Sequence, residues 1–133
     1  MNINLFRENL RILVTGGAGF IGGCLIRKLL NKSNAEIFNL DKITYASDLS
    51  WIKNNVNSQR HHLINADLAD FEQTQKAINK SNPDLIIHLA AESHVDRSIE
   101  NSKPFIESNI LGTYNLLENS RQHWKNLNYL RKQ

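Results

Sequence analysis

The chain has 133 residues, 41% of them hydrophobic, and a formal net charge of +3 at pH 7. That length suits one domain with an ordinary core and excludes two full domains. The basic residues are spread along the chain apart from a short tail at 125–132, so no nucleic-acid partner is expected. The tail is interpreted as a solvated terminus in preference to a polyanion contact.

The cysteine, the histidines and the apolar residues indicate which cellular location, metal binding and membrane association to expect. Cys24 is the only cysteine, which fits a reducing, cytoplasmic location, and a packing role is favoured over a reactive thiol. His61 and His62 are interpreted as packing and surface histidines, because no ligand cluster predicts a metal. The N-terminus lacks an apolar signal region, and no apolar run approaches ~18 residues. We therefore expect neither secretion nor a membrane span.

Apolar runs alternate with helical patterns along the chain, which is typical of βαβ units and a parallel sheet. Strands are expected at 11–14, 36–40, 62–65 and 84–89, and helices at 19–31, 49–57, 71–79 and 104–123. Pro104 suits the first turn of the last helix, where an apolar face recurs at Ile106, Ile110, Thr113 and Leu117.

Right-handed crossovers from a central first strand give the spatial strand order 3-2-1-4. We therefore predict an α/β fold, the first half of a Rossmann-like parallel sheet with helices on both faces. In such a half the fourth strand is an exposed edge, where Ile86 and Ile87 lack part of their usual cover.

The segment TGGAGFIG, residues 15–22, lies between the first predicted strand and the first predicted helix. Gly16 permits a tight turn, Gly19 lets the backbone approach a pyrophosphate, and Gly22 lets the helix pack close to the sheet. The N–H groups and positive dipole end of the helix N-terminus favour an anion. An ordinary turn is the alternative, but the flanking strand and helix, with Asp41 about 20 residues further on, favour a dinucleotide site.

Carboxylates follow the second and third predicted strands. Asp41 can accept hydrogen bonds from both ribose hydroxyls and would repel a 2′-phosphate, which favours NAD over NADP, although a loop cap is the alternative. Asp67 and Leu68 are placed to meet the adenine ring. For Asp67 or Asp70, a cap on the next helix is the preferred interpretation.

The segment HLAAESHVDRS, residues 88–98, ends a buried strand with small residues that polar residues follow. Ala90 and Ala91 are small enough to admit a ribose and a nicotinamide ring. The mouth of the predicted cleft then carries hydrogen-bonding groups from Glu92, Ser93, His94, Asp96 and Arg97. Acid–base catalysis by His94 with Asp96 is the alternative to a turn-building role for these residues, which we prefer.

The motifs TGGAGFIG, DKITYASDL (41–49), DL (67–68), HLAAESHVDRSI (88–99) and NILGTYNLLE (109–118) together resemble the dTDP-glucose 4,6-dehydratases. These are extended short-chain dehydrogenase/reductases that act on a nucleotide sugar, and the resemblance covers about residues 10–127. It implies NAD contacts at Phe20, Ile21, Asp41, Lys42, Ile43, Thr44, Asp67, Leu68, Leu89, Ala90, Ala91, Glu92, Ser93 and Ser108. Ser93 would also reach the substrate.

Two features depart from that family. Gly23 stands where relatives usually carry a serine or another small residue. Relatives also continue into a Thr-Asp-Glu catalytic segment, a Tyr-x-x-x-Lys pair and a sugar-nucleotide-binding domain, and residues 1–133 contain none of these. We therefore expect 1–133 to be a truncated NAD-binding Rossmann domain without catalytic residues, inactive alone, from a dTDP-glucose-dependent family.

Other interpretations remain open. The chain is alternatively a non-catalytic NAD-binding module, or a subunit completed by a second chain that supplies the missing half. Within the enzymes, a nucleotide-sugar epimerase or decarboxylase is the nearest competitor. Intact relatives are generally dimers, and helix 104–123 is the candidate surface for a homodimer.

Overall fold

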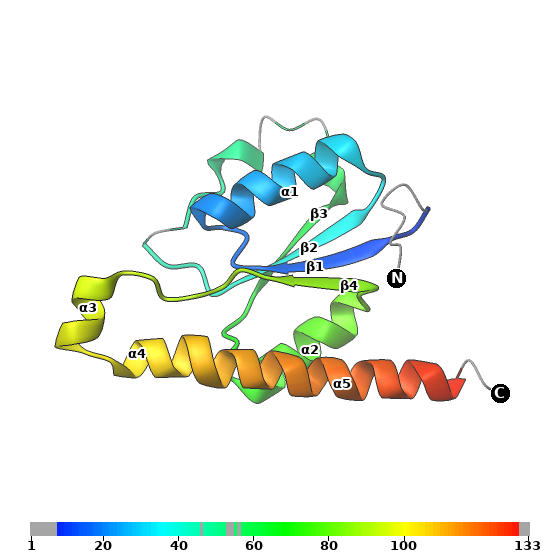
Figure 1. Cartoon of the computed structure of the whole chain (residues 1–133). Coiled ribbons are helices and arrows are strands. Elements are labelled where there is room, and N and C mark those ends of the chain that lie inside the picture. The colour runs from blue at the N-terminus through cyan, green and yellow to red at the C-terminus, as the bar shows by residue number, and fades with distance from the viewer. Residues whose placement is uncertain (1–7, 46, 53–54, 56, 131–133) are drawn as a thin grey trace. The chain divides into compact units, whose positions relative to one another are not determined.

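The computed structural model describes residues 8–45, 47–52, 55 and 57–130. The chain divides into two compact units, of which the first comprises Met1–Asn65 and Ser81–Ala90, and the second Ala66–Lys80 and Ala91–Gln133. Figure 1 labels the helices and strands of both units. That residues 1–133 form one truncated domain stays a prediction.

The first unit contains a four-stranded parallel sheet. Its strands are β1 (Arg11–Thr15), β2 (Glu36–Asp41), β3 (His61–Asn65) and β4 (Leu85–His88). They lie in the order β3-β2-β1-β4, which confirms the predicted order. In the register, Leu13 of β1 lies opposite Phe38 of β2 on one side and Ile86 of β4 on the other.

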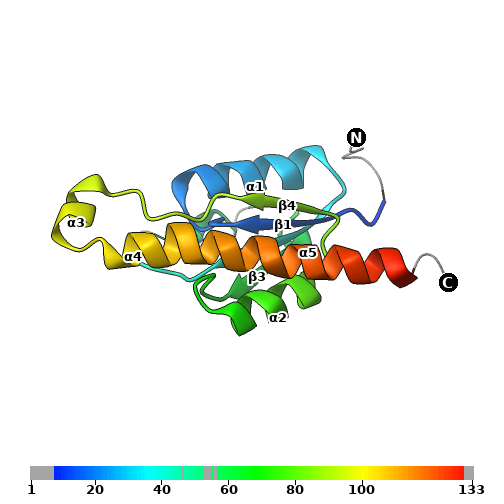
Figure 2. The ribbon, with the colours of Figure 1, turned by 60° about the horizontal axis from the view of Figure 1, so that its bottom comes forward.

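Helix α1 (Phe20–Lys32) lies along one face of this sheet (Figure 2). Ile12 and Ile37 of the strands pack in one buried cluster with Ile26 and Leu30 of α1. Leu13, on the opposite face of β1, is also fully buried. Burial on both faces is the reason why β1 is a continuous apolar run instead of an alternating one.

Strand β4 forms one edge of the sheet, because β1 is its only neighbour among the described strands. All four of its residues are half-buried, whereas Ile12, Leu13 and Val14 of β1 are completely buried. The expected exposed edge, with incomplete cover over Ile86 and Ile87, is therefore confirmed.

The second unit is helical. It comprises α2 (Phe71–Ser81, whose last residue belongs to the first unit), α3 (Val95–Glu100), α4 (Lys103–Phe105), the π-helix η3 (Ile106–Leu111) and α5 (Gly112–Leu130). The predicted helix at 104–123 is confirmed with Pro104 in its first turn, whereas α3 and the π-helical segment were not predicted. None of the helices in the described part of the chain has the length and apolarity that crossing a bilayer requires.

The apolar face that helical periodicity predicted for the last helix is largely exposed. The exposed fractions are 53%, 65% and 65% for Ile106, Ile110 and Leu117. The buried face of α5 consists instead of Asn115, Leu116, Asn119 and Ser120. The Asn115 amide donates to the carbonyls of Leu68 and Ala69 at 2.8 and 3.0 Å. Hydrogen bonds of this kind allow a polar helix face to be buried, and a search for apolar periodicity does not detect them.

The helix expected at 49–57 is also not formed as predicted. The described residues there contain only short 3-10 helices, η1 (Ser50–Ile52) and, beyond it, η2 (Ser58–Arg60). Residues 53, 54 and 56 lie outside the described part. The Asn55 side chain accepts a hydrogen bond from the Asn57 N–H at 2.9 Å, and such local side-chain bonds compete with helical ones.

Candidate functional site

The turn between β1 and α1 begins at Gly16, whose φ of 72° lies in the left-handed region. A Cβ at Gly16 would lie 2.6 Å from the backbone nitrogen of Ala90, just after β4. The Gly16 N–H donates to the Leu40 carbonyl of β2 at 2.8 Å. The carboxyl ends of three strands therefore converge at this glycine, which is where parallel α/β sheets bind ligands.

Two further glycines determine how closely α1 approaches. A Cβ on Gly17 would overlap the side chains of Asn39 in β2 and Ile26 in α1, and a Cβ on Gly22 would overlap the carbonyl oxygen of Gly16. Gly17 thus permits the close approach of helix and sheet, and Gly22 lets α1 pack against the turn that follows β1. Sequence analysis missed Gly17 because one glycine of an adjacent pair carries no spacing signal.

The N-terminus of α1 is open to an anion. Gly19 is the N-cap and supplies no side-chain hydrogen bond, and the first turn contains no acidic residue. The N–H groups of Phe20, Ile21 and Gly22 have no intrahelical acceptors at these positions. Phe20 is 95% exposed, so this helix end faces solvent. The donors and the helix dipole both suit a phosphate group.

Asp41 links the end of β2 to the glycine turn. Its Oδ2 accepts a hydrogen bond from the Ala18 N–H at 3.0 Å, and its Oδ1 accepts one from the Ile43 N–H at 2.9 Å. A carboxylate has about four acceptor sites, so these two bonds leave capacity for hydroxyl donors. Asp41 therefore caps its loop, as the alternative interpretation held, and also lies beside the turn at 16–19 and the start of α1, which we call the phosphate cradle as the candidate phosphate site.

A buried hydroxyl organises the junction of β1 and β4. Thr15 Oγ1 accepts hydrogen bonds from the N–H groups of Leu89 and Ala90, both at 3.2 Å, and lies 2.6 Å from His88 Nδ1. With its acceptor sites occupied, the hydroxyl donates to Nδ1, which makes His88 a neutral Nε2–H tautomer. Burial lowers the pKa of His88, consistent with this neutral state.

The predicted cofactor residues that belong to the first unit are Gly16, Gly19, Phe20, Ile21, Gly22, Asp41, Lys42, Ile43, Thr44, Leu89 and Ala90. Hydrogen bonds join the glycine turn to the end of β2, and the segment after β4 to the end of β1. The remaining predicted residues belong to the second unit. Contact with a cofactor stays a prediction for the residues of both units.

In the second unit, Asp70 caps α2. Its Oδ1 accepts the Gln73 N–H at 2.9 Å, and the Gln73 side chain donates back to Oδ2 at 3.0 Å. The first of these bonds is the main reason why the pKa of Asp70 is lowered. The Asp67 carboxylate accepts the Ala69 N–H at 2.9 Å, and Leu68 is buried. The preferred interpretation of a helix cap is confirmed for Asp70.

The segment that starts at Ala91 is held by a residue that sequence analysis missed. Asn109, in η3, accepts the Glu92 N–H at 2.8 Å and donates to the Glu92 carbonyl at 3.0 Å. Ser93 is exposed and Ser108 is half-buried. A single asparagine on a helix gives no sequence signal of such a contact, although π-helical segments are frequent at functional sites.

The polar residues after Ser93 form the start of α3. His94 occupies its N-cap position, and Asp96 and Arg97 lie in the helix itself. In the described part of the chain, no group of three or more histidine, cysteine and acidic side chains could hold a metal ion.

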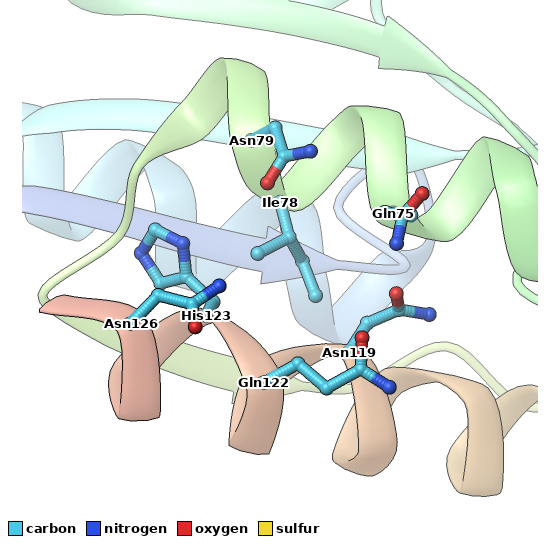
Figure 3. Close-up of a pocket in the computed structure, with 7 residues that line it drawn as sticks. All are labelled: Gln75, Ile78, Asn79, Asn119, Gln122, His123 and Asn126. Carbon is cyan, nitrogen blue, oxygen red and sulfur yellow. The ribbon is translucent and has the colours of Figure 1, made fainter. Parts of the chain in front are cut away.

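A pocket between α2 and α5 contains none of the predicted residues (Figure 3). Ile78 is its single apolar lining residue, and the others are Gln75, Asn79, Asn119, Gln122, His123 and Asn126. Asn119 Oδ1 and His123 Nε2 are buried without a hydrogen-bond partner among the described atoms. The lining residues carry no formal charge apart from that which His123 can acquire, and burial lowers the pKa of His123.

Known proteins are similar to this chain in both sequence and fold. A probable dTDP-glucose 4,6-dehydratase of Sinorhizobium fredii is 47% identical over 123 residues, which are 92% of this chain and 35% of that protein. The structure of the dTDP-glucose 4,6-dehydratase DesIV of Streptomyces venezuelae, with NAD bound, matches with a TM-score of 0.77 at 36% identity over 86% of this chain and 36% of that one. A Thermus thermophilus UDP-glucose 4-epimerase in complex with NAD matches with a TM-score of 0.74 at 35% identity, over 86% and 34% of the two chains.

The sheet order, the glycine turn into α1 and the carboxylate at the end of β2 define a Rossmann-like fragment. The family model described as GDP-mannose 4,6 dehydratase matches residues 13–131. The chain belongs to this family, and it spans about a third of the length of the curated relatives it matches. The resemblance to the N-terminal portion of dTDP-glucose 4,6-dehydratases is therefore confirmed.

Proposed function

We propose that the chain is the NAD-binding portion of a dTDP-glucose 4,6-dehydratase. The observation that carries this proposal is the hydrogen bond from the Ala18 N–H to the Asp41 carboxylate. This bond holds the Asp41 carboxylate beside the N-terminus of α1, which supports the proposal because a ribose-binding carboxylate near a phosphate-binding helix end would suit an adenosine pyrophosphate. The solved relatives with NAD bound support this assignment.

We infer which parts of NAD the residues of the first unit would contact. The pyrophosphate would be held by the N–H groups at the start of α1, where Gly19 offers no side chain to block its approach. Asp41 would accept hydrogen bonds from the ribose hydroxyls. When bound, NAD supplies a reversible hydride acceptor, and this chain's residues bind and orient it. In the second unit we propose contacts from Asp67, Leu68, Ala91, Glu92, Ser93 and Ser108, with Ser93 also reaching the sugar nucleotide.

Calorimetric titration of the full chain with NAD and NADP tests the proposal. We expect NAD to bind more tightly than NADP, and Asp41→Ala to weaken NAD binding at least tenfold, because it removes the ribose acceptors. Glu72→Ala, which removes an exposed carboxylate from the first turn of α2, is the control. Thermal melts check that each variant folds, and unchanged NAD affinity in a folded Asp41→Ala variant would contradict the proposal.

Residues 1–133 alone are expected to be inactive. No tyrosine in them has a lysine four residues later, and this pair provides the base for the sugar hydroxyl in the family that the chain resembles. The purified chain, incubated with dTDP-glucose and NAD, should yield no 4-keto-6-deoxy sugar. Measurable turnover would overturn this expectation.

A non-catalytic NAD-binding module completed by a second chain is the alternative function. The observation that favours it is the position of β4 at the edge of the described sheet, because an edge strand can pair with a strand of another chain. Addition of a separately purified C-terminal portion of a dTDP-glucose 4,6-dehydratase should then give turnover. A nucleotide-sugar epimerase is the alternative within enzymes, favoured by the Thermus thermophilus structure, whereas the HLAAESHVDRS segment favours the dehydratase.

We also propose that helix 104–123 forms a homodimer surface, since Ile106, Ile110 and Leu117 expose apolar side chains along it. Leu117→Lys should then convert a dimer to a monomer in sedimentation experiments, and a monomeric wild type would contradict the proposal. A cytoplasmic location stays a prediction, based on the single Cys24.

A further inference from the structure

The loop after β2 is attached to the glycine turn at two points, and both involve Ala18. The Ala18 N–H donates to the Asp41 carboxylate at 3.0 Å, and the Ala18 carbonyl accepts a hydrogen bond from the Asp48 N–H at 2.8 Å. Ala18 itself is 1% exposed. The two ends of the loop thus bracket one buried residue of the phosphate cradle.

Trp51 holds the second of these attachment points. Its indole Nε1–H donates to the Asp48 carbonyl at 3.1 Å. The Asp48 side chain accepts the Ser50 N–H at 2.9 Å, which tightens the turn that leads from Asp48 to Trp51. The indole therefore fixes the residue whose own N–H reaches Ala18.

The Trp51 ring is fixed in turn by its surroundings. It is half-buried and packs against the core cluster that α1 shares with the sheet. The Arg27 guanidinium carbon lies 5.7 Å from the ring centroid, a cation–π distance. The His61 ring meets it edge-on at 5.3 Å. Contacts on these sides restrict the indole to one orientation.

The space for the indole depends on Gly23. A Cβ at Gly23 would lie 3.2 Å from Trp51 Nε1, which is tighter than an ordinary van der Waals contact. The absence of a side chain at Gly23 therefore leaves the space that the Trp51 indole occupies.

We propose that Trp51 is a positioning residue for the adenosine side of the NAD site. Through Asp48 it attaches the described loop residues 42–45 and 47–50 to the glycine turn, an attachment that we call the latch, so that the proposed ribose-binding carboxylate and the phosphate cradle keep a fixed separation. The proposal rests on the proposed NAD binding for its effect on ligands, whereas the latch itself is a property of the ligand-free chain.

Hydrogen exchange of the ligand-free chain tests the latch. Trp51→Phe removes the Nε1–H donor but keeps an aromatic ring over Arg27, so the fold should be retained. Loss of one hydrogen bond should speed exchange of the Asp48 N–H about fivefold, while amides of β1 and β2 stay unchanged. Trp124→Phe, in the second unit, is the control. Unchanged Asp48 exchange in Trp51→Phe would overturn the proposal.

Binding measurements separate the latch from the proposed function. Trp51→Phe should weaken NAD and ADP-ribose by the same factor, about fivefold, because both carry the adenosine half. Gly23→Ala should act in the same direction by displacing the indole. Unchanged affinity for both ligands in Trp51→Phe would overturn the positioning role. If the wild type binds neither ligand, the NAD assignment fails, and the exchange measurement still decides the latch.

Discussion

Asn109 and Glu92 are joined by two hydrogen bonds, because the Asn109 side chain accepts the Glu92 N–H at 2.8 Å and donates to the Glu92 carbonyl at 3.0 Å. A carboxamide that pairs with both backbone groups of one residue imitates the pairing of a neighbouring strand. It secures the backbone of the segment after Ala91 without the help of a sheet. Ser93, for which we propose a substrate contact, is the next residue along the chain.

Replacement of Asn109 should loosen this segment. We expect Asn109→Ala to cost about 1 kcal/mol of unfolding free energy, since the lost bonds are exposed to solvent. Asn109→Asp keeps the acceptor for the Glu92 N–H but loses the donor, so it should be intermediate. Urea unfolding measures the stability, and hydrogen exchange of the Glu92 amide measures the local effect. Unchanged Glu92 exchange in Asn109→Ala would contradict the prediction.

Alanine substitutions of Gly16 and Gly19 should differ in their effects on stability and on NAD binding. Gly16→Ala should destabilise the chain by at least about 2 kcal/mol, because of its positive φ and the overlap with Ala90. Gly19→Ala should cost less than about 1 kcal/mol, since its φ of −81° suits alanine and its nearest obstacle is 3.3 Å away. Gly19→Ala should nevertheless weaken NAD binding at least tenfold. Calorimetry and thermal melts of both variants check the contrast, and tight NAD binding by Gly19→Ala would contradict it.

His88 should make stability depend on pH. Burial lowers its pKa below the unfolded value of about 6.5, so the folded state binds fewer protons than the unfolded state. The contribution of His88 is therefore complete above about pH 6.5 and declines as the pH falls below it. His88→Asn keeps an acceptor for the Thr15 hydroxyl but does not titrate, and its unfolding free energy should vary less between about pH 7 and pH 5. An identical pH slope would refute this assignment.

Arg60 should contribute to stability through the carboxyl end of α1. Its guanidinium donates to the carbonyls of Ser33 and Ala35 at 3.1 and 2.8 Å, and also to that of Leu30. Arg60→Lys lacks the forked donors and should lose about 1–3 kcal/mol in urea unfolding. Lys28→Ala, an exposed site on α1, should change stability by less than about 0.5 kcal/mol. Equal midpoints for the two variants would argue against the capping role of Arg60.

The strands of the sheet and the glycine turn between β1 and α1 could be predicted from local patterns in the sequence. Strands β1 and β2 are buried on both faces and are therefore continuous apolar runs. The alternation of strand and helix patterns, with right-handed crossovers, predicted the strand order. The glycine turn and Asp41 were recognisable because they lie at fixed positions relative to β1, α1 and β2. These are local signals, and the backbone conformation that they encode depends on near neighbours in the chain.

The partner of each side chain depends on contacts between distant residues, which the sequence patterns did not reveal. Asn109 pairs with Glu92 across seventeen residues, and Gly17 faces Asn39 across the helix–sheet boundary. The apolar stripe that includes Ile106 is exposed, while the Asn115 face is buried by hydrogen bonds to carbonyls far along the chain. Periodicity records how apolar a face is, but hydrogen bonds and steric contacts between distant residues depend on how the folded chain brings them together.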